Sequence, residues 1–208
     1  MLNRILPVIA LLAAIAFAVQ ASAQAQGFTQ PTATSSPNAP KYDGNKLIFP
    51  DGFRTSWMFV GSNLGLVYKG EPGPGAGKAA FHNVYITPDG YAGFLNTKTT
   101  FPDPTILVVD IYSADKKEPH HILAKGVYNG TQSGALVAVK NSARPPGPNG
   151  EKTIWAYYVF PDISKPGASA AAQPDANCEA CHKKNGLVDN VWVQFYPVLR
   201  DAMKATTK

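Results

Sequence analysis

Both cysteines of the 208-residue chain lie in one short motif near its C-terminus, Cys178-x-x-Cys181-His182. Two cysteines at this spacing can form a small disulfide in an oxidising compartment or contribute to a zinc site. A zinc site needs further ligands, and the sequence has no second Cys pair or nearby Cys/His pair to supply them. A thioredoxin-like disulfide needs a strand-to-helix start, which the preceding sequence lacks. The histidine directly after the second cysteine is instead typical of the attachment of haem c.

In such a motif the two thiols bond to the two vinyl groups of the porphyrin, and the imidazole takes the proximal position on the iron. We therefore predict one covalent haem c, attached through Cys178 and Cys181, with His182 as the proximal iron ligand. An ordinary small cytochrome c is a short helical domain with its motif near the N-terminus. Here a long strand-rich sequence comes first.

Residues 1–23 have the features of a secretory signal peptide. They contain Arg4, an apolar run over residues 5–19 and the small residues Ala21-Ser22-Ala23 at the end. The apolar run is too short to cross a bilayer. Cleavage removes Arg4 and lowers the formal net charge from +5 to about +4. We expect a periplasmic protein with no membrane span after cleavage, and no nucleic-acid partner because the positive charge is mild and spread out.

Residues 24–42 are rich in Gln, Thr, Ser and Pro and are predicted to form a disordered arm. Residues 43–204 are predicted to form one haem domain. Within this domain, apolar patterns predict strands over residues 56–61, 80–87, 105–112, 134–140 and 153–160. The strand at 105–112 has apolar residues on both faces, which indicates a central position in a sheet.

The connecting segments complete the predicted fold. A short helix begins at Pro88 and buries Tyr91 and Phe94, residues 71–77 form a loop, residues 167–173 form an Ala-rich linker, and residues 189–204 form a helix interrupted at Pro197. The strand aromatics are expected in the core or a dimer interface: Trp57, Trp155, Tyr157 and Tyr158. The predicted fold class is α+β, a mainly antiparallel five-stranded β-sheet with a few helices and the haem near the C-terminus.

Several segments together resemble the cytochrome P460 family, including its relative cytochrome c′-β. In order, they are Trp57-x-x-Val60-Gly61, Val84-Tyr85-Ile86, Phe101-Pro-Asp103, Thr105-Ile-Leu-Val-Val-Asp110, Val139-Lys140-Asn141-Ser142, Trp155-Ala-Tyr157, Cys178-x-x-Cys-His182 and Phe195-Tyr-Pro-Val-Leu-Arg200. The resemblance covers residues 43–200. It implies a homodimer of five-stranded sheets, each holding one haem c with a five-coordinate iron.

Catalytic members of this family oxidise hydroxylamine, and the resemblance locates three departures from them. Val109 stands where those enzymes have a lysine bonded to the porphyrin edge, Leu136 where they have a carboxylate that assists proton removal, and His82 where they have a distal arginine. Val109 has no nitrogen for that bond, and neither Val109 nor Leu136 can accept a proton. The chain is in this respect similar to cytochrome c′-β. The departures predict an apolar distal pocket that binds a small gas, nitric oxide or carbon monoxide, and leave enzymatic activity open.

Three alternatives remain at this stage. An exposed five-coordinate haem reacts weakly with peroxide, and His82 can serve as a distal base for such peroxidase-like activity. His82 can line the distal pocket and bind the iron as a sixth ligand, which would make the protein an electron-transfer cytochrome with a redox partner protein. Alternatively, Lys98 or Lys78 can reach the porphyrin from a shifted position, which would preserve a hydroxylamine- or NO-oxidising enzyme.

Overall fold

The computed structural model describes residues 38–67, 79–117, 120, 122 and 124–205. Its strands are β1 (Tyr42–Asp43), β2 (Lys46–Ile48), β3 (Met58–Leu64), β4 (Ala80–Ile86), β5 (Thr105–Asp115), β6 (Tyr128–Lys140), β7 (Trp155–Phe160) and β8 (Ser169–Ala171). Its helices are α1 (Phe53–Ser56), α2 (Pro88–Thr97), α3 (Glu179–Asn185) and α4 (Pro197–Lys204), with a 3-10 turn η1 (Val193–Phe195). Within these residues, no helix is long and apolar enough to cross a membrane.

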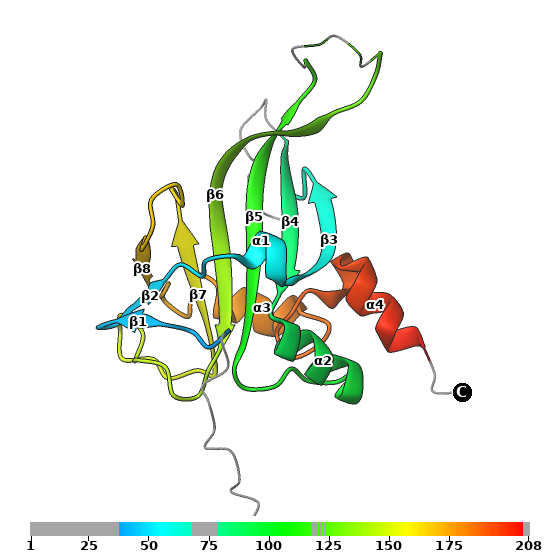
Figure 1. The fold of residues 1–208 in the computed structure, drawn as a ribbon. Helices are drawn as coiled ribbons and strands as arrows, with labels where there is room; N and C mark the ends of the chain where they lie inside the picture. The colour runs from blue at the N-terminus through cyan, green and yellow to red at the C-terminus, as the bar shows by residue number, and fades with distance from the viewer. Residues whose placement is uncertain (1–37, 68–78, 118–119, 121, 123, 206–208) are drawn as a thin grey trace, which may run out of the picture. The chain divides into compact units, whose positions relative to one another are not determined.

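A five-stranded antiparallel sheet forms the centre of the fold, in the order β3-β4-β5-β6-β7 (Figure 1). Each strand pairs with the strand that follows it in the chain, so the sheet is a simple meander. β5 is the central strand, and Thr105 to Val108 are buried on both of its faces, as the sequence predicts. A small sheet of β1, β2 and β8 accompanies it. This arrangement confirms the predicted α+β class.

Two C-terminal segments differ from the prediction. The expected linker at 167–173 contains β8, which pairs with β2 antiparallel. The expected helix at 189–204 begins only at Pro197, where α4 starts. Asp189 and Asn190 have φ angles of 48° and 63°, a left-handed conformation that a right-handed helix does not accommodate.

The N-terminal boundaries also shift. Ser56, expected in the first strand, ends α1, and β3 begins at Met58. Tyr42, expected in the disordered arm, belongs to β1. The predicted loop at 71–77 lies outside the described residues. The helix expected after Pro88 is present as α2, and it buries Phe94 fully.

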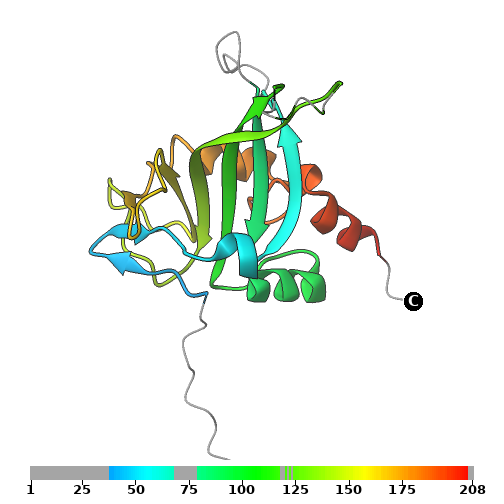
Figure 2. The same cartoon turned by 45° about the horizontal axis from the view of Figure 1, so that its top comes forward.

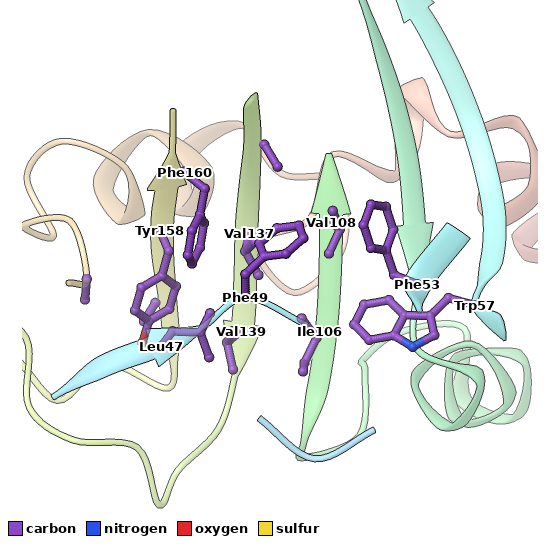
Figure 3. Close-up of a cluster of buried hydrophobic side chains, with 13 residues drawn as sticks. Leu47, Phe49, Phe53, Trp57, Ile106, Val108, Val137, Val139, Tyr158 and Phe160 are labelled. Carbon is purple, nitrogen blue, oxygen red and sulfur yellow. The ribbon is translucent and has the colours of Figure 1, made fainter. Parts of the chain in front are cut away.

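The two faces of the sheet bury two separate hydrophobic clusters. The first lies under α1 and β2, where Phe49 contacts Phe53 and Phe160 edge-to-face (Figure 3). The second lies on the opposite face and includes Phe94, Trp155 and residues that follow α3. Figures 1 and 2 both show α1 on one side of the sheet and α3 on the other. Burial of large apolar side chains on both faces holds the sheet rigid between them.

Candidate functional site

Helix α3 carries the cysteine–histidine motif along the second face of the sheet. Cys178 immediately precedes the helix, and the backbone N–H of His182 donates to the Cys178 carbonyl at 3.0 Å. The two side chains therefore lie one turn apart on the same side of the helix. Both side chains line a cavity between α3, the segment after it and the sheet. Cys181 is exposed and is not among the residues lining this cavity, and neither thiol takes part in a disulfide.

The sheet supplies the other wall of the cavity, and most of that wall is apolar, with Asn63 of β3 and His82 of β4 as polar members. One row of side chains crosses four adjacent strands as direct neighbours: Val84, Val109, Leu136 and Val159. A second row lies next to it along the strands: Leu107, Ala138 and Tyr157. Because side chains alternate between the two faces of a strand, these residues all point to the same side.

The cavity has an empty volume of about 950 Å³, its open mouth included. In the part of the chain that the structure describes, its lining contains no Lys, Arg, Asp or Glu side chain. A large, apolar slot that a histidine and a cysteine face on one side fits a haem.

The His182 ring has a defined orientation. Its Nδ1 lies 2.9 Å from the carbonyl oxygen of Asn190 and 2.9 Å from the indole Nε1 of Trp192. The ring of Tyr157 packs against the imidazole with 4.3 Å between centroids. Burial lowers the pKa of His182, although the Asn190 carbonyl acts in the opposite direction, so the imidazole is neutral near pH 7. A neutral imidazole that donates from Nδ1 has Nε2 available as a metal ligand.

A buried carboxylate, Glu179, connects the motif to its surroundings. The Tyr157 hydroxyl donates to one Glu179 oxygen at 3.0 Å, and the Asn190 side-chain amide donates to the other at 2.8 Å. Burial raises the pKa of Glu179, with the Tyr157 hydrogen bond opposing it. Burial and the neighbouring Glu179 charge raise the pKa of Tyr157 as well, so its hydroxyl stays protonated and remains a donor.

The predicted distal residues lie in the same cavity as Cys178 and His182. Val109 and Leu136 stand side by side on β5 and β6, and His82 lines the cavity from β4. His82 is half-buried, and burial lowers its pKa, which keeps it neutral near pH 7. Lys98 is not among the cavity residues: it is exposed after α2, and its Nζ donates to the Ala205 carbonyl. Lys78 lies outside the described residues.

The sequence did not predict the partners of His182. The Asn190 carbonyl is a backbone group, so the residue type at this position does not indicate its contact with His182. Trp192 follows the motif in the chain, but nothing in the sequence indicates that its indole approaches His182 Nδ1. Lys140 and Asp189, which form a 2.7 Å ion pair next to this segment, are 49 positions apart in the chain. The left-handed tendency of an Asp-Asn pair is the only local signal for the turn at Asp189 and Asn190.

The fold and the cavity together define a class of protein: an α+β haem-binding cytochrome whose sheet, and not a helical bundle, forms one wall of the haem site. A comparison with protein-family models agrees with this. The family model Cytochrome P460 matches residues 50–193, and the chain belongs to this family. The membership makes haem the cofactor of this protein. No curated protein matches the chain.

Proposed function

We propose that the protein holds one covalent haem c in this cavity, with thioether bonds from Cys178 and Cys181 and with His182 Nε2 as the proximal ligand. The placement of Cys178 and His182 on the cavity wall supports the proposal. Cys181 is exposed, and its sulfur accepts from the Asn185 side-chain amide at 3.4 Å, so the thiol is accessible at the edge of the motif. Haem, when bound here, supplies an iron that takes up nitric oxide or carbon monoxide without a proton donor.

The ligand we propose is a small uncharged gas, with nitric oxide as the leading candidate. The observation that carries this proposal is the apolar row on the sheet, in which Val109 and Leu136 occupy adjacent central positions. Such a wall excludes water and anions but admits a diatomic gas. Oxidation of hydroxylamine releases protons, and the described lining contains no lysine or carboxylate to accept them, which leaves His82 as the base on the sheet side of the cavity.

Spectroscopy of the purified holoprotein tests the proposal. We expect the denatured protein to show the spectrum of an ordinary haem c, and the reduced protein to bind nitric oxide and carbon monoxide in titrations. Hydroxylamine with an electron acceptor should give no turnover. Turnover at the rate of a lysine-containing member of the family would refute the proposal.

A matched pair of variants tests the apolar wall itself. Leu136→Glu places a carboxylate next to Val109, which draws water into the cavity, and we expect roughly tenfold weaker gas binding. Leu136→Met keeps the wall apolar at similar volume and should bind like the wild type. Equal gas affinity in all three proteins would show that the polarity of this wall does not select the ligand.

A second candidate function follows from His82. Its position on the cavity and its neutral state would allow it to bind the iron opposite His182, which would produce a six-coordinate electron-transfer cytochrome. A low-spin spectrum of the resting protein that becomes high-spin in His82→Ala would establish this function. A high-spin resting spectrum would exclude it.

We also propose export to the periplasm, a homodimer and, for the electron-transfer alternative, a redox partner protein. The charge and apolar pattern of residues 1–23 support export, and the family resemblance supports the dimer. Cell fractionation tests the location, and light scattering of the holoprotein tests the dimer. A cytoplasmic holoprotein would contradict export, and a monomer in solution would contradict the homodimer.

A further inference from the structure

The segment that contacts His182 is a tight two-residue turn. Val188 and Val191 face each other in an antiparallel bridge, and the Val191 N–H donates to the Val188 carbonyl at 2.8 Å. The two residues between them, Asp189 and Asn190, both have positive φ, as this kind of hairpin turn requires. Asp and Asn adopt the left-handed conformation more readily than other non-glycine residues, but two such residues in succession still carry a cost that contacts from outside the turn offset.

Lys140 in β6 supplies that support through Asp189. The Asp189 Oδ2 accepts from Lys140 Nζ at 2.7 Å, from the Phe101 N–H at 2.9 Å and from Thr100 Oγ1 at 2.9 Å. Its Oδ1 accepts from the Trp155 indole at 3.3 Å. Lys140 Nζ also donates to Thr100 Oγ1 at 3.1 Å and to the Phe101 carbonyl at 2.8 Å. All three ammonium hydrogens therefore have an acceptor.

This ion pair is well shielded from solvent. The Lys140 and Asp189 side chains are 9% and 17% exposed. A buried ion pair is weak evidence for a gain in stability, because the desolvation of two charges offsets their attraction. It does fix geometry, since removing Lys140 leaves the Asp189 carboxylate with neutral donors only and no counter-charge. The pair ties the turn to the sheet and to the segment before β5.

The position of the turn decides which nitrogen of His182 carries the proton. The Asn190 carbonyl can only accept, so its 2.9 Å contact requires a proton on Nδ1 and leaves Nε2 free for a metal. The Trp192 indole N–H can only donate, so its 2.9 Å contact with the same nitrogen favours the opposite tautomer. A turn that holds the Asn190 carbonyl against His182 selects the first of these two states.

We propose that the Lys140–Asp189 ion pair is a positioning device for His182, which acts through the Asn190 carbonyl to keep Nδ1 protonated and Nε2 available to the iron. The inference rests on the proposed function, in which His182 is the proximal haem ligand. Lys140 and Asp189 act through the turn and contact neither the imidazole nor the cavity. The Glu179 carboxylate also helps to hold Asn190 in place, because it accepts a hydrogen bond from the Asn190 side-chain amide.

The test is resonance Raman spectroscopy of the reduced holoprotein, which reports the iron–histidine stretching band. A hydrogen bond from Nδ1–H to a carbonyl makes the imidazole a stronger ligand, so losing it weakens the bond to iron. In Lys140→Met we expect the band to move to lower frequency and broaden, with the haem content unchanged. Lys140→Arg keeps a charged donor to Asp189 and should restore most of the wild-type band.

Two further variants separate positioning from general stability. Asp189→Asn removes the charge but keeps a similar shape, and it decides the question if Lys140→Met does not fold. Lys165→Met makes the same chemical change at an exposed lysine and should leave the band unaltered. A wild-type protein without haem or without the iron–histidine band would defeat the proposed function. If the wild type has the iron–histidine band and a folded Lys140→Met or Asp189→Asn variant has it at the same frequency, the positioning role is wrong but the proposed function stands.

Discussion

Arg54→Met is the substitution whose consequence the structure predicts most directly. Asp110 in β5 is fully buried, and its carboxylate accepts from Arg54 Nε at 2.6 Å, from Arg54 Nη2 at 2.9 Å and from Gln132 Nε2 at 3.3 Å. Removing one partner of a buried ion pair costs about 3–5 kcal/mol. The Arg54 side chain is 44% exposed, so solvent already screens part of the attraction, and Gln132 remains as a donor. We therefore expect a loss of about 2–3 kcal/mol in the free energy of unfolding.

Denaturant unfolding of the holoprotein, followed by circular dichroism, measures this loss. Asp110 lies on the opposite face of β5 from its neighbour Val109, so the haem absorption should not change while stability falls. The double variant Arg54→Met/Asp110→Leu removes both charges and should recover most of the stability. A loss below about 1 kcal/mol in Arg54→Met, or a double variant less stable than the single one, would refute the view that Asp110 depends on Arg54.

Three further predictions concern the surroundings of the site. Tyr157→Phe removes one donor to Glu179 but keeps the ring against His182, so urea unfolding should show a loss of about 1–2 kcal/mol and the haem spectrum should stay the same. Burial alone would raise the pKa of Asp189, but hydrogen bonds from Lys140 and others lower it, so its contribution to stability is present above about pH 4 and lost as the pH falls through its folded pKa. The stability difference between wild type and Asp189→Asn should accordingly shrink in acid, and a pH-independent difference would contradict this. Gly134→Ala places a Cβ 2.7 Å from the Phe160 carbonyl at a φ of 128°, and calorimetry should show a loss of about 2 kcal/mol or more.

The parts of the fold that sequence could predict are those with local signals. The strands β4 to β7 are long enough for their apolar pattern to be visible, and the continuous apolar run of β5 indicated its central position. β8 has only three residues, all Ser or Ala, and its pairing with β2 is decided by tertiary contacts. Asp189 lies between apolar residues at near-helical spacing, and nothing in that pattern indicates that its carboxylate is held by Lys140 of β6.

The candidate site divides along the same line. The cysteine–histidine motif is contiguous, so residue types and spacing predict it. The apolar wall comes from residues on different strands, and only the family resemblance singled out Val109 and Leu136 together. Their assembly in one cavity depends on strand register, which the residue pattern constrains but does not determine.

The register of β5 and β6 depends on a bulge in β6 that lies beyond the cavity residues. Along β5 and β6 the pairing is regular from Thr105 to Ile111, and it then shifts so that Tyr112 pairs with Gln132. The extra residue, Ser133, forms a bulge beside Gly134, whose positive φ accommodates it. Without this bulge, β6 would have to shift by one residue against β5 along the regular part of the pairing, between Thr105 and Ile111. It would turn Leu136 away from the cavity and bring Ala135 or Val137 into its place. The pairing shifts a second time between Tyr112 and Ala114, so the bulge beside Gly134 is one of two irregularities that together set the alignment of Val109 with Leu136. The apolar character of the wall depends on that alignment.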